Sequence, residues 1–203
     1  MPSEFWRRAG RAALVALLLT GPSPAAGSEP PRLLERVLAE VDGAPVLHSD
    51  VSLLASLNGL SEERALEAAI DERLMFQQAI RLTQAALTPE QEQAALASLL
   101  SRPEAAQWPE SGLRRLARRQ ATILKYVEFR FRAQLRLDEA AVRELYEREW
   151  AGNPEAPPFE SAQAALRERL LRQALDERVE SWVRELRESA DIRRNLEGGS
   201  RRE

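Results

Sequence analysis

Apolar residues recur every three or four positions over most of the chain, and this spacing is typical of helices that bury one face. The predicted helices begin near Ser49 or Asp50, Ser61, Thr88, Trp108, Asp138 and Phe159. Thr88-Pro89-Glu90-Gln91 is a capping box with proline at the first helical position. The apolar stripe of the helix after Ser61 continues to Ile80, and that of the helix after Trp108 continues to Leu135.

A different pattern precedes these helices, namely two short apolar runs separated by a turn. Residues 37–41 and 45–47 are predicted strands, and Asp42-Gly43 between them is a strong hairpin signal. Pro45 restricts the second strand to a sheet edge, because proline lacks the N–H group that a central strand needs. A further strand is predicted over residues 191–193, where it can complete the hairpin, since a lone hairpin is only marginally stable.

The predicted fold class is mainly α-helical, a multi-helix assembly with a small N-terminal β-hairpin completed by a short C-terminal strand. One helical domain is expected over residues 37–194, with its N-terminal and C-terminal parts packed together. Residues 28–36 are predicted to form a linker. Residues 195–203 contain glycine and arginine and are predicted to form a disordered tail.

The first 27 residues are predicted to be a cleaved signal peptide. Arg7, Arg8 and Arg11 precede an apolar stretch at residues 12–19, and small residues follow. Cleavage after either Ala25 or Gly27 fits the small-x-small rule, and the sequence does not decide between them. The apolar stretch is much shorter than the ~20 residues that a spanning helix needs. We therefore expect export to the periplasm without stable membrane insertion.

Composition narrows the kinds of partner that the exported protein can have. The full chain has no cysteine and a formal net charge of −3, and loss of the signal peptide removes three arginines and one glutamate, which leaves −5. No disulfide can form. Binding to nucleic acid is disfavoured by this charge. The basic cluster Arg114, Arg115, Arg118 and Arg119 flanks an apolar helix face, so we interpret it as a solvated helix surface.

Signals of enzymatic chemistry are absent from the sequence. Its single histidine, His48, follows the hairpin, and we interpret it as a turn residue because general acid–base work needs an oriented partner. The sequence contains no nucleophile elbow, phosphate loop or dinucleotide fingerprint. With no cysteine and one histidine, a metal site is not expected. The prediction is a protein without catalytic activity and without a cofactor.

Four large side chains are candidates for binding a peptide. Phe129 and Phe131 stand two residues apart, so one helix cannot aim both rings at the same core line, and Phe129 is the one that we assign to a groove. Met75 and Phe76 are adjacent and pose the same problem. Trp108 is the fourth candidate. The alternative is that all of these side chains belong to the core, where most large aromatic residues are found.

The order of these elements resembles the chaperone module of the SurA family. Residues 37–51 match its strand, turn and proline-containing strand before a Ser-Asp-Val helix start. Residues 65–79 resemble its Ala-Leu-x-x-Leu-Ile helix, and Leu124-Lys125-Tyr126 and residues 182–192 match later elements. In many relatives a prolyl-isomerase domain precedes the closing helix, whereas residues 152–158 here join the two flanking helices directly.

The resemblance implies an ATP-independent periplasmic chaperone without isomerase activity. Its expected partners are unfolded or nascent exported polypeptides, including outer-membrane β-barrel precursors. An alternative is a dedicated interaction subunit or assembly factor of one cell-envelope complex, and an isomerase with a hidden site is the least favoured. The sequence leaves open whether the protein is a monomer or a homodimer.

Overall fold

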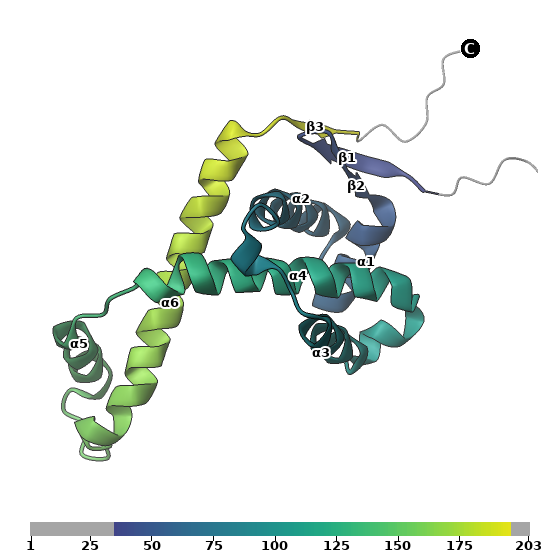
Figure 1. Ribbon diagram of the computed structural model, residues 1–203. Coiled ribbons are helices and arrows are strands. Elements are labelled where there is room, and N and C mark those ends of the chain that lie inside the picture. Colours follow the sequence, from purple (N-terminus) through teal and green to yellow (C-terminus); the bar gives the residue numbers. More distant parts are fainter. Residues whose placement is uncertain (1–34, 196–203) are drawn as a thin grey trace, which may run out of the picture. The chain divides into compact units, whose positions relative to one another are not determined.

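The computed structural model describes residues 35–195, which form six α-helices and one three-stranded antiparallel sheet (Figure 1). The strands are β1 (Val37–Val41), β2 (Ala44–Leu47) and β3 (Ile192–Arg194). The α-helices are α1 (His48–Asn58), α2 (Glu62–Ala79), α3 (Pro89–Leu100), α4 (Glu110–Arg130), α5 (Glu139–Trp150) and α6 (Phe159–Ser189). Three 3₁₀ helices lie between them: η1 (Thr83–Ala85), η2 (Pro103–Gln107) and η3 (Arg132–Gln134). The predicted signal peptide, most of the predicted linker and residues 196–203 lie outside the described residues.

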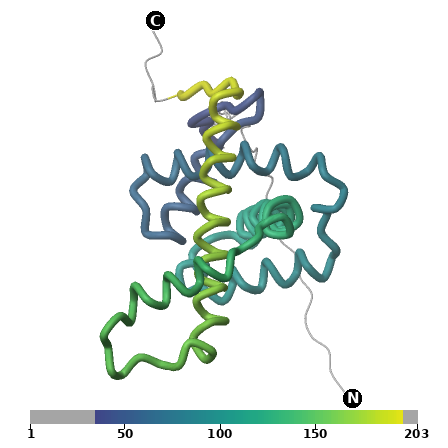
Figure 2. The backbone as a smooth tube through the Cα atoms, turned by 90° about the vertical axis from the view of Figure 1, so that its left-hand side faces the viewer, coloured from purple at the N-terminus to yellow at the C-terminus, as the bar shows by residue number. Residues whose placement is uncertain are grey.

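β1 is the central strand of the sheet, because it pairs with β2 on one side and with β3 on the other. Asp42 and Gly43 have positive φ angles of 48° and 78°, as a two-residue hairpin turn requires. The second partner comes from the far end of the described chain, where Ile192 pairs with Val41. Figure 2 shows the chain returning along α6 to this sheet. The predicted fold class, mainly helical with a hairpin completed by a C-terminal strand, is confirmed.

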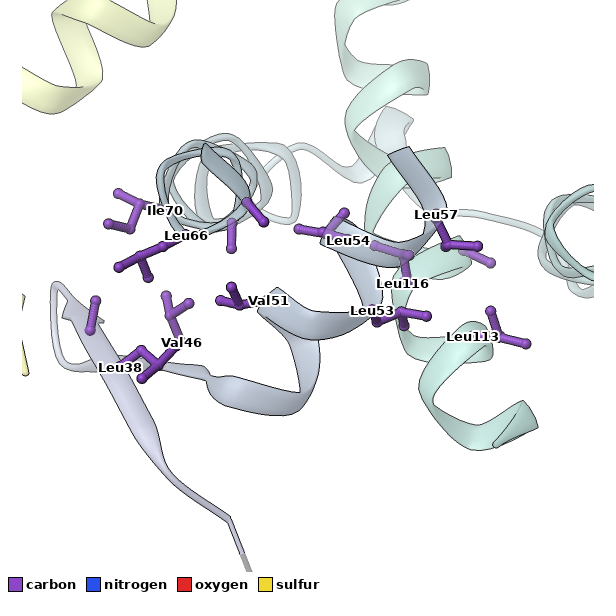
Figure 3. Packing of buried hydrophobic residues seen from close by; sticks show 14 of the residues in the cluster. Leu38, Val46, Val51, Leu53, Leu54, Leu57, Leu66, Ile70, Leu113 and Leu116 are labelled. Atoms are coloured by element: carbon purple, nitrogen blue, oxygen red, sulfur yellow. The ribbon is translucent and has the colours of Figure 1, made fainter. Parts of the chain in front are cut away.

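The main hydrophobic core joins the hairpin to the first four helices. Leu38 and Val46 of the hairpin lie near Leu66 and Ile70 of α2 (Figure 3). The core continues through α1 to α4, with the labelled side chains Val51, Leu53, Leu54, Leu57, Leu113 and Leu116. Burying each large aliphatic side chain contributes ~1.5–3 kcal/mol. The apolar stripes predicted for the helices after Ser61 and Trp108 are thus core-facing surfaces.

α6 takes part in two further clusters, one near each end. Towards its C-terminus, Trp182 is buried, stacks on Tyr126 of α4 with ring centroids 5.0 Å apart, and meets Phe131 edge-on at 5.3 Å. Such aromatic pairs add ~0.5–1.5 kcal/mol beyond the burial of their area. Near its N-terminus, α6 packs with α5 through Val142, Leu145, Ala162 and Leu166. α6 therefore links the helical hairpin that its N-terminal part forms with α5 to α2 and α4.

The predicted cap of the first helix is wrong. α1 begins at His48 after Leu47, whose side chain cannot cap it, and Ser49 and Asp50 lie inside the helix. Asp50 is 4% exposed, because its carboxylate faces Arg73 and Arg119 rather than the backbone at the helix start. A buried carboxylate needs such cationic neighbours, because burial of an unpaired charge is costly.

Two predicted helices end earlier than their apolar spacing suggests. Ile80 is the C-cap of α2 and is 58% exposed. After it the N–H groups of Arg81 and Leu82 donate to carbonyls three residues back, so the regular helix does not continue. α4 ends before Leu135, since Phe131 leaves the helix with its ring against Trp182. At the other end of the fold, the backbone N–H of Asn195, the first residue of the predicted tail, donates to the carbonyl of Leu38 at 2.7 Å.

Arg187 joins the C-terminal end of α6 to α2. Its Nε donates to Asp71 Oδ1 at 2.5 Å, and its Nη1 donates to Glu67 Oε2 at 3.0 Å. Arg194 of β3 donates to the same Glu67 carboxylate at 3.2 Å. The hydrogen bond to Asp71 raises the pKa of Arg187 against the opposing effect of partial burial. These charged contacts fix α6 beside α2 where the sheet closes.

Arg187→Ala should lower the free energy of unfolding by about 1–3 kcal/mol, because it removes several hydrogen bonds between charged groups. Arg193→Ala is the matched control, since Arg193 is 69% exposed and pairs with Asp191, two residues away. That control should cost less than about 0.5 kcal/mol. Equilibrium denaturation of both variants measures the difference, and equal losses would contradict a joining role for Arg187.

Candidate binding pocket

A pocket of about 650 Å³ lies between α1, α2, α4 and α6. From α1 and α2 it is lined by Leu54, Ala68 and Met75, and from α4 and α6 by Ile123, Leu124, Val127, Leu175 and Val179. Its polar lining residues are Asn58, Glu72, Gln120, Asp176 and Glu180. Along each helix the lining positions are mostly three or four residues apart, so each helix contributes one face to the pocket. The pocket is predominantly apolar.

The apolar lining residues differ in how much surface they expose. Ile123 and Val127 are 9% and 7% exposed and belong to the cluster around Trp182. Leu124, next to Ile123 on α4, is 60% exposed. The deeper wall is therefore part of the packed core and is held in one geometry, whereas Leu124 offers apolar surface to solvent that a bound molecule could cover.

A charged network lies behind the polar part of this wall. Glu72 is 8% exposed, and its Oε1 accepts a hydrogen bond from Arg119 Nε at 2.6 Å. Its Oε2 accepts one from Gln120 Nε2 at 3.3 Å. Arg119 Nη2 also lies 3.3 Å from Asp50 Oδ1, and Arg73 Nη2 lies 3.8 Å from Asp50 Oδ2. Two carboxylates and two guanidinium groups thus compensate one another between α1, α2 and α4.

This network serves to hold the helices. Burial alone would lower the pKa of Arg119, but attraction by Glu72 and Asp50 and the hydrogen bond to Glu72 outweigh it and raise the pKa. Removing one member of such a buried group typically costs ~3–5 kcal/mol, because a charge is left without its partner. We therefore assign these side chains to stability, with Glu72 also forming part of the pocket surface.

A second, smaller pocket of about 330 Å³ lies at the C-terminal end of α2. The segment that connects α2 to α3 and residues of α3 and α4 complete its lining. Phe76 and Ile80 line it, together with Leu82, Leu87 and Thr122. Arg118 and Glu92, which also line it, form an ion pair at 3.3 Å. Met75 and Phe76, adjacent in sequence, thus line different pockets.

The other two predicted binding residues lie elsewhere. Trp108 is half-buried, packs against the main core, and its Nε1 donates to Ser56 Oγ at 3.1 Å. Phe129 is 52% exposed while Phe131 is 6% exposed, so the ring that leaves the core line is Phe129. Neither Trp108 nor Phe129 lines either of the two pockets. The four predicted residues therefore do not gather in one place.

Sequence reasoning did not single out the side chains that α6 contributes to the larger pocket. Leu175 and Val179 stand four apart in the predicted apolar stripe, where they look like ordinary core positions. Leu124 was a detectable candidate, because it is adjacent to Ile123 and both cannot face the same core line. That α1, α2 and α6 face Leu124 across one pocket, however, follows only from the tertiary structure.

The described residues offer no cluster of three or more metal-ligating side chains. His48 begins α1, and its side chain is 44% exposed, with Nε2 3.7 Å from Glu62 Oε1. Across residues 35–195, no helix is long and apolar enough to cross a membrane.

No model of a known protein family matches this chain, and no curated protein sequence matches it.

Phe129→Ala and Phe131→Ala form a matched pair that tests the assignment of these two rings. Phe131→Ala should cost ~3–5 kcal/mol of unfolding free energy, as is typical of a buried phenylalanine. Phe129→Ala should cost less than about 1 kcal/mol, since half of its ring is already in water. Denaturant titration of both variants measures the costs, and a larger loss for Phe129→Ala would place its ring in the core.

Proposed function

We propose that this protein is an ATP-independent periplasmic chaperone that holds unfolded or nascent exported polypeptides, outer-membrane β-barrel precursors among them. The pocket between α1, α2, α4 and α6 is the observation that carries this proposal. Its volume falls within the ~300–1,000 Å³ range of binding pockets, and its lining is largely apolar. An unfolded chain presents the apolar side chains that such a pocket buries, whatever their exact sequence.

The arrangement of the pocket suits reversible binding without nucleotide. Its deeper wall is part of a packed cluster. The side chains of this wall are already ordered, so binding costs little of their conformational entropy. Its small area limits affinity for any one segment, and several weak contacts along a client chain can add up. Release then needs only competition from the client's own folding.

The resemblance to the SurA family supports the same proposal. A helical core with an N-terminal hairpin completed by a C-terminal strand is the architecture that the resemblance implies. The proposal includes a cleaved signal peptide over residues 1–27 and the absence of prolyl-isomerase activity. Accelerated cis–trans isomerisation of a proline-containing peptide would contradict the latter.

A dedicated subunit of one cell-envelope complex is the second candidate. It is favoured by the hairpin of α5 and the first part of α6, whose buried cluster is separate from the other two. Tyr146, Trp150 and Phe159 are only partly buried there, and such aromatic surface suits one specific partner. Tight binding to a single envelope protein, with no affinity for unrelated unfolded chains, would favour this candidate over the chaperone.

Suppression of aggregation tests the chaperone proposal directly. The protein is purified from the envelope fraction of cells that express the full chain, and its N-terminus is determined. An unfolded outer-membrane barrel and an unrelated soluble protein are each diluted from denaturant in its presence. We expect protection of both at near-stoichiometric ratios without nucleotide. A folded protein that protects neither would contradict the proposal.

Leu124→Ala should weaken binding of an unfolded client about three- to tenfold. A leucine side chain contributes ~1.5–3 kcal/mol when it is fully buried, and the exposed part of Leu124 can supply about half of this to a client. Leu100→Ala is the control, because Leu100 is 47% exposed on α3 and lines neither pocket. Client affinity is measured by titration calorimetry. Equal weakening by both variants would exclude a specific role for the pocket.

A further inference from the structure

We propose that the pocket between α1, α2, α4 and α6 selects apolar segments of unfolded polypeptide that carry an arginine or lysine beside the apolar residues. This inference rests on the proposed function and specifies which clients the pocket prefers. It is carried by the charged residues of the pocket lining, which are all acidic: the lining includes Glu72, Asp176 and Glu180 but no arginine, lysine or histidine.

Glu72 is already compensated inside the protein. Its two oxygens accept hydrogen bonds from Arg119 and Gln120, and its side chain is nearly buried. A bound client would gain little from approaching a carboxylate whose charge Arg119 balances at 2.6 Å. The attraction for a cation must therefore come from the other two carboxylates.

Asp176 and Glu180 stand four residues apart on α6, and both are exposed. Among residues 35–195, neither makes an ion pair or a side-chain hydrogen bond. Arg178, which lies between them in sequence, instead pairs with Glu185 at 3.4 Å and lies over the Phe131 ring. Like charges at this spacing repel each other slightly on a helix surface. A cation bound between them would relieve that repulsion.

The geometry places this charge next to apolar surface. Leu175 and Val179, each one residue before a carboxylate, line the same pocket as Asp176 and Glu180. A client that inserts an apolar side chain against Leu175 and Val179 therefore brings its neighbouring residues to the two carboxylates. Arginine and lysine suit this position well, because their aliphatic stems cover apolar surface while the charge stays in water. An acidic neighbour would be repelled.

Anionic occupants fit this surface poorly. Nucleic acid and the phosphate groups of lipids would meet two carboxylates with no cation in the lining to balance them. A neutral apolar peptide can still enter the pocket. The carboxylates therefore raise the affinity for cationic clients but are not required for binding. The expected preference is about three- to tenfold, which is the range that two solvent-exposed ion pairs can provide.

Two synthetic peptides with the same central run of apolar residues test the inference. One peptide has lysines at the flanking positions and the other has glutamates. Their affinities for the full-length, naturally processed protein are measured by titration calorimetry at low and at high salt. We expect the lysine peptide to bind about three- to tenfold more tightly at low salt. The difference should shrink at high salt, because ions screen exposed charges.

Two charge-neutralising variants decide where the preference arises. D176N/E180Q should bind both peptides with nearly equal affinity. E144Q/E147Q changes the net charge by the same amount on α5, outside the pocket lining, and should keep the preference. Equal binding of both peptides by the unmodified protein, or an undiminished preference in D176N/E180Q, would overturn the inference and leave the proposed function standing. Binding of neither peptide by the folded protein would contradict both.

Discussion

The architecture depends on one strand that is shared between the two ends of the described chain. β1 pairs with β2 through a two-residue turn and with β3 from the other end of the described chain. Beside the second pairing, the backbone N–H of Asp191 donates to Asp42 Oδ1, which is 149 residues away in sequence. Pairing across such a distance carries a large loop-closure cost in entropy. The ion pairs of Arg187 and Arg194 with α2 offset part of that cost. Closure of the sheet positions the C-terminal end of α6.

That position of α6 creates the pocket. α1, α2 and α4 bury apolar faces in the main core, and Leu186 near the C-terminal end of α6 packs against that core. α6 adds Trp182 to the end of α4 and places Leu175 and Val179 across from Met75 and Ile123. The concave apolar surface is thus a consequence of how the chain returns to its first strand, because no single helix contains it.

The sequence predicted the fold class well, since its main signals are local. The Asp42-Gly43 turn, the capping box at Thr88 and the three-and-four spacing of apolar residues all act within a few positions. The candidate site was predicted less well. Met75 lines the larger pocket, but Trp108 packs on the core, because adjacency in sequence does not reveal which neighbour covers a side chain. Asp50 was misassigned as a cap because its cationic partners come from α2 and α4.

The carboxylates near the pocket fall into two groups with different physical consequences. Asp50 and Glu72 are buried, and the fold must supply guanidinium groups for them, since an uncompensated charge there would be costly. Asp176 and Glu180 are exposed, so water already solvates them and no internal partner is required. A fold that needs no cation at these two positions leaves them available to a partner's cation. The same helix surface can therefore combine an apolar contact with a selective charge without any cost to the stability of the core.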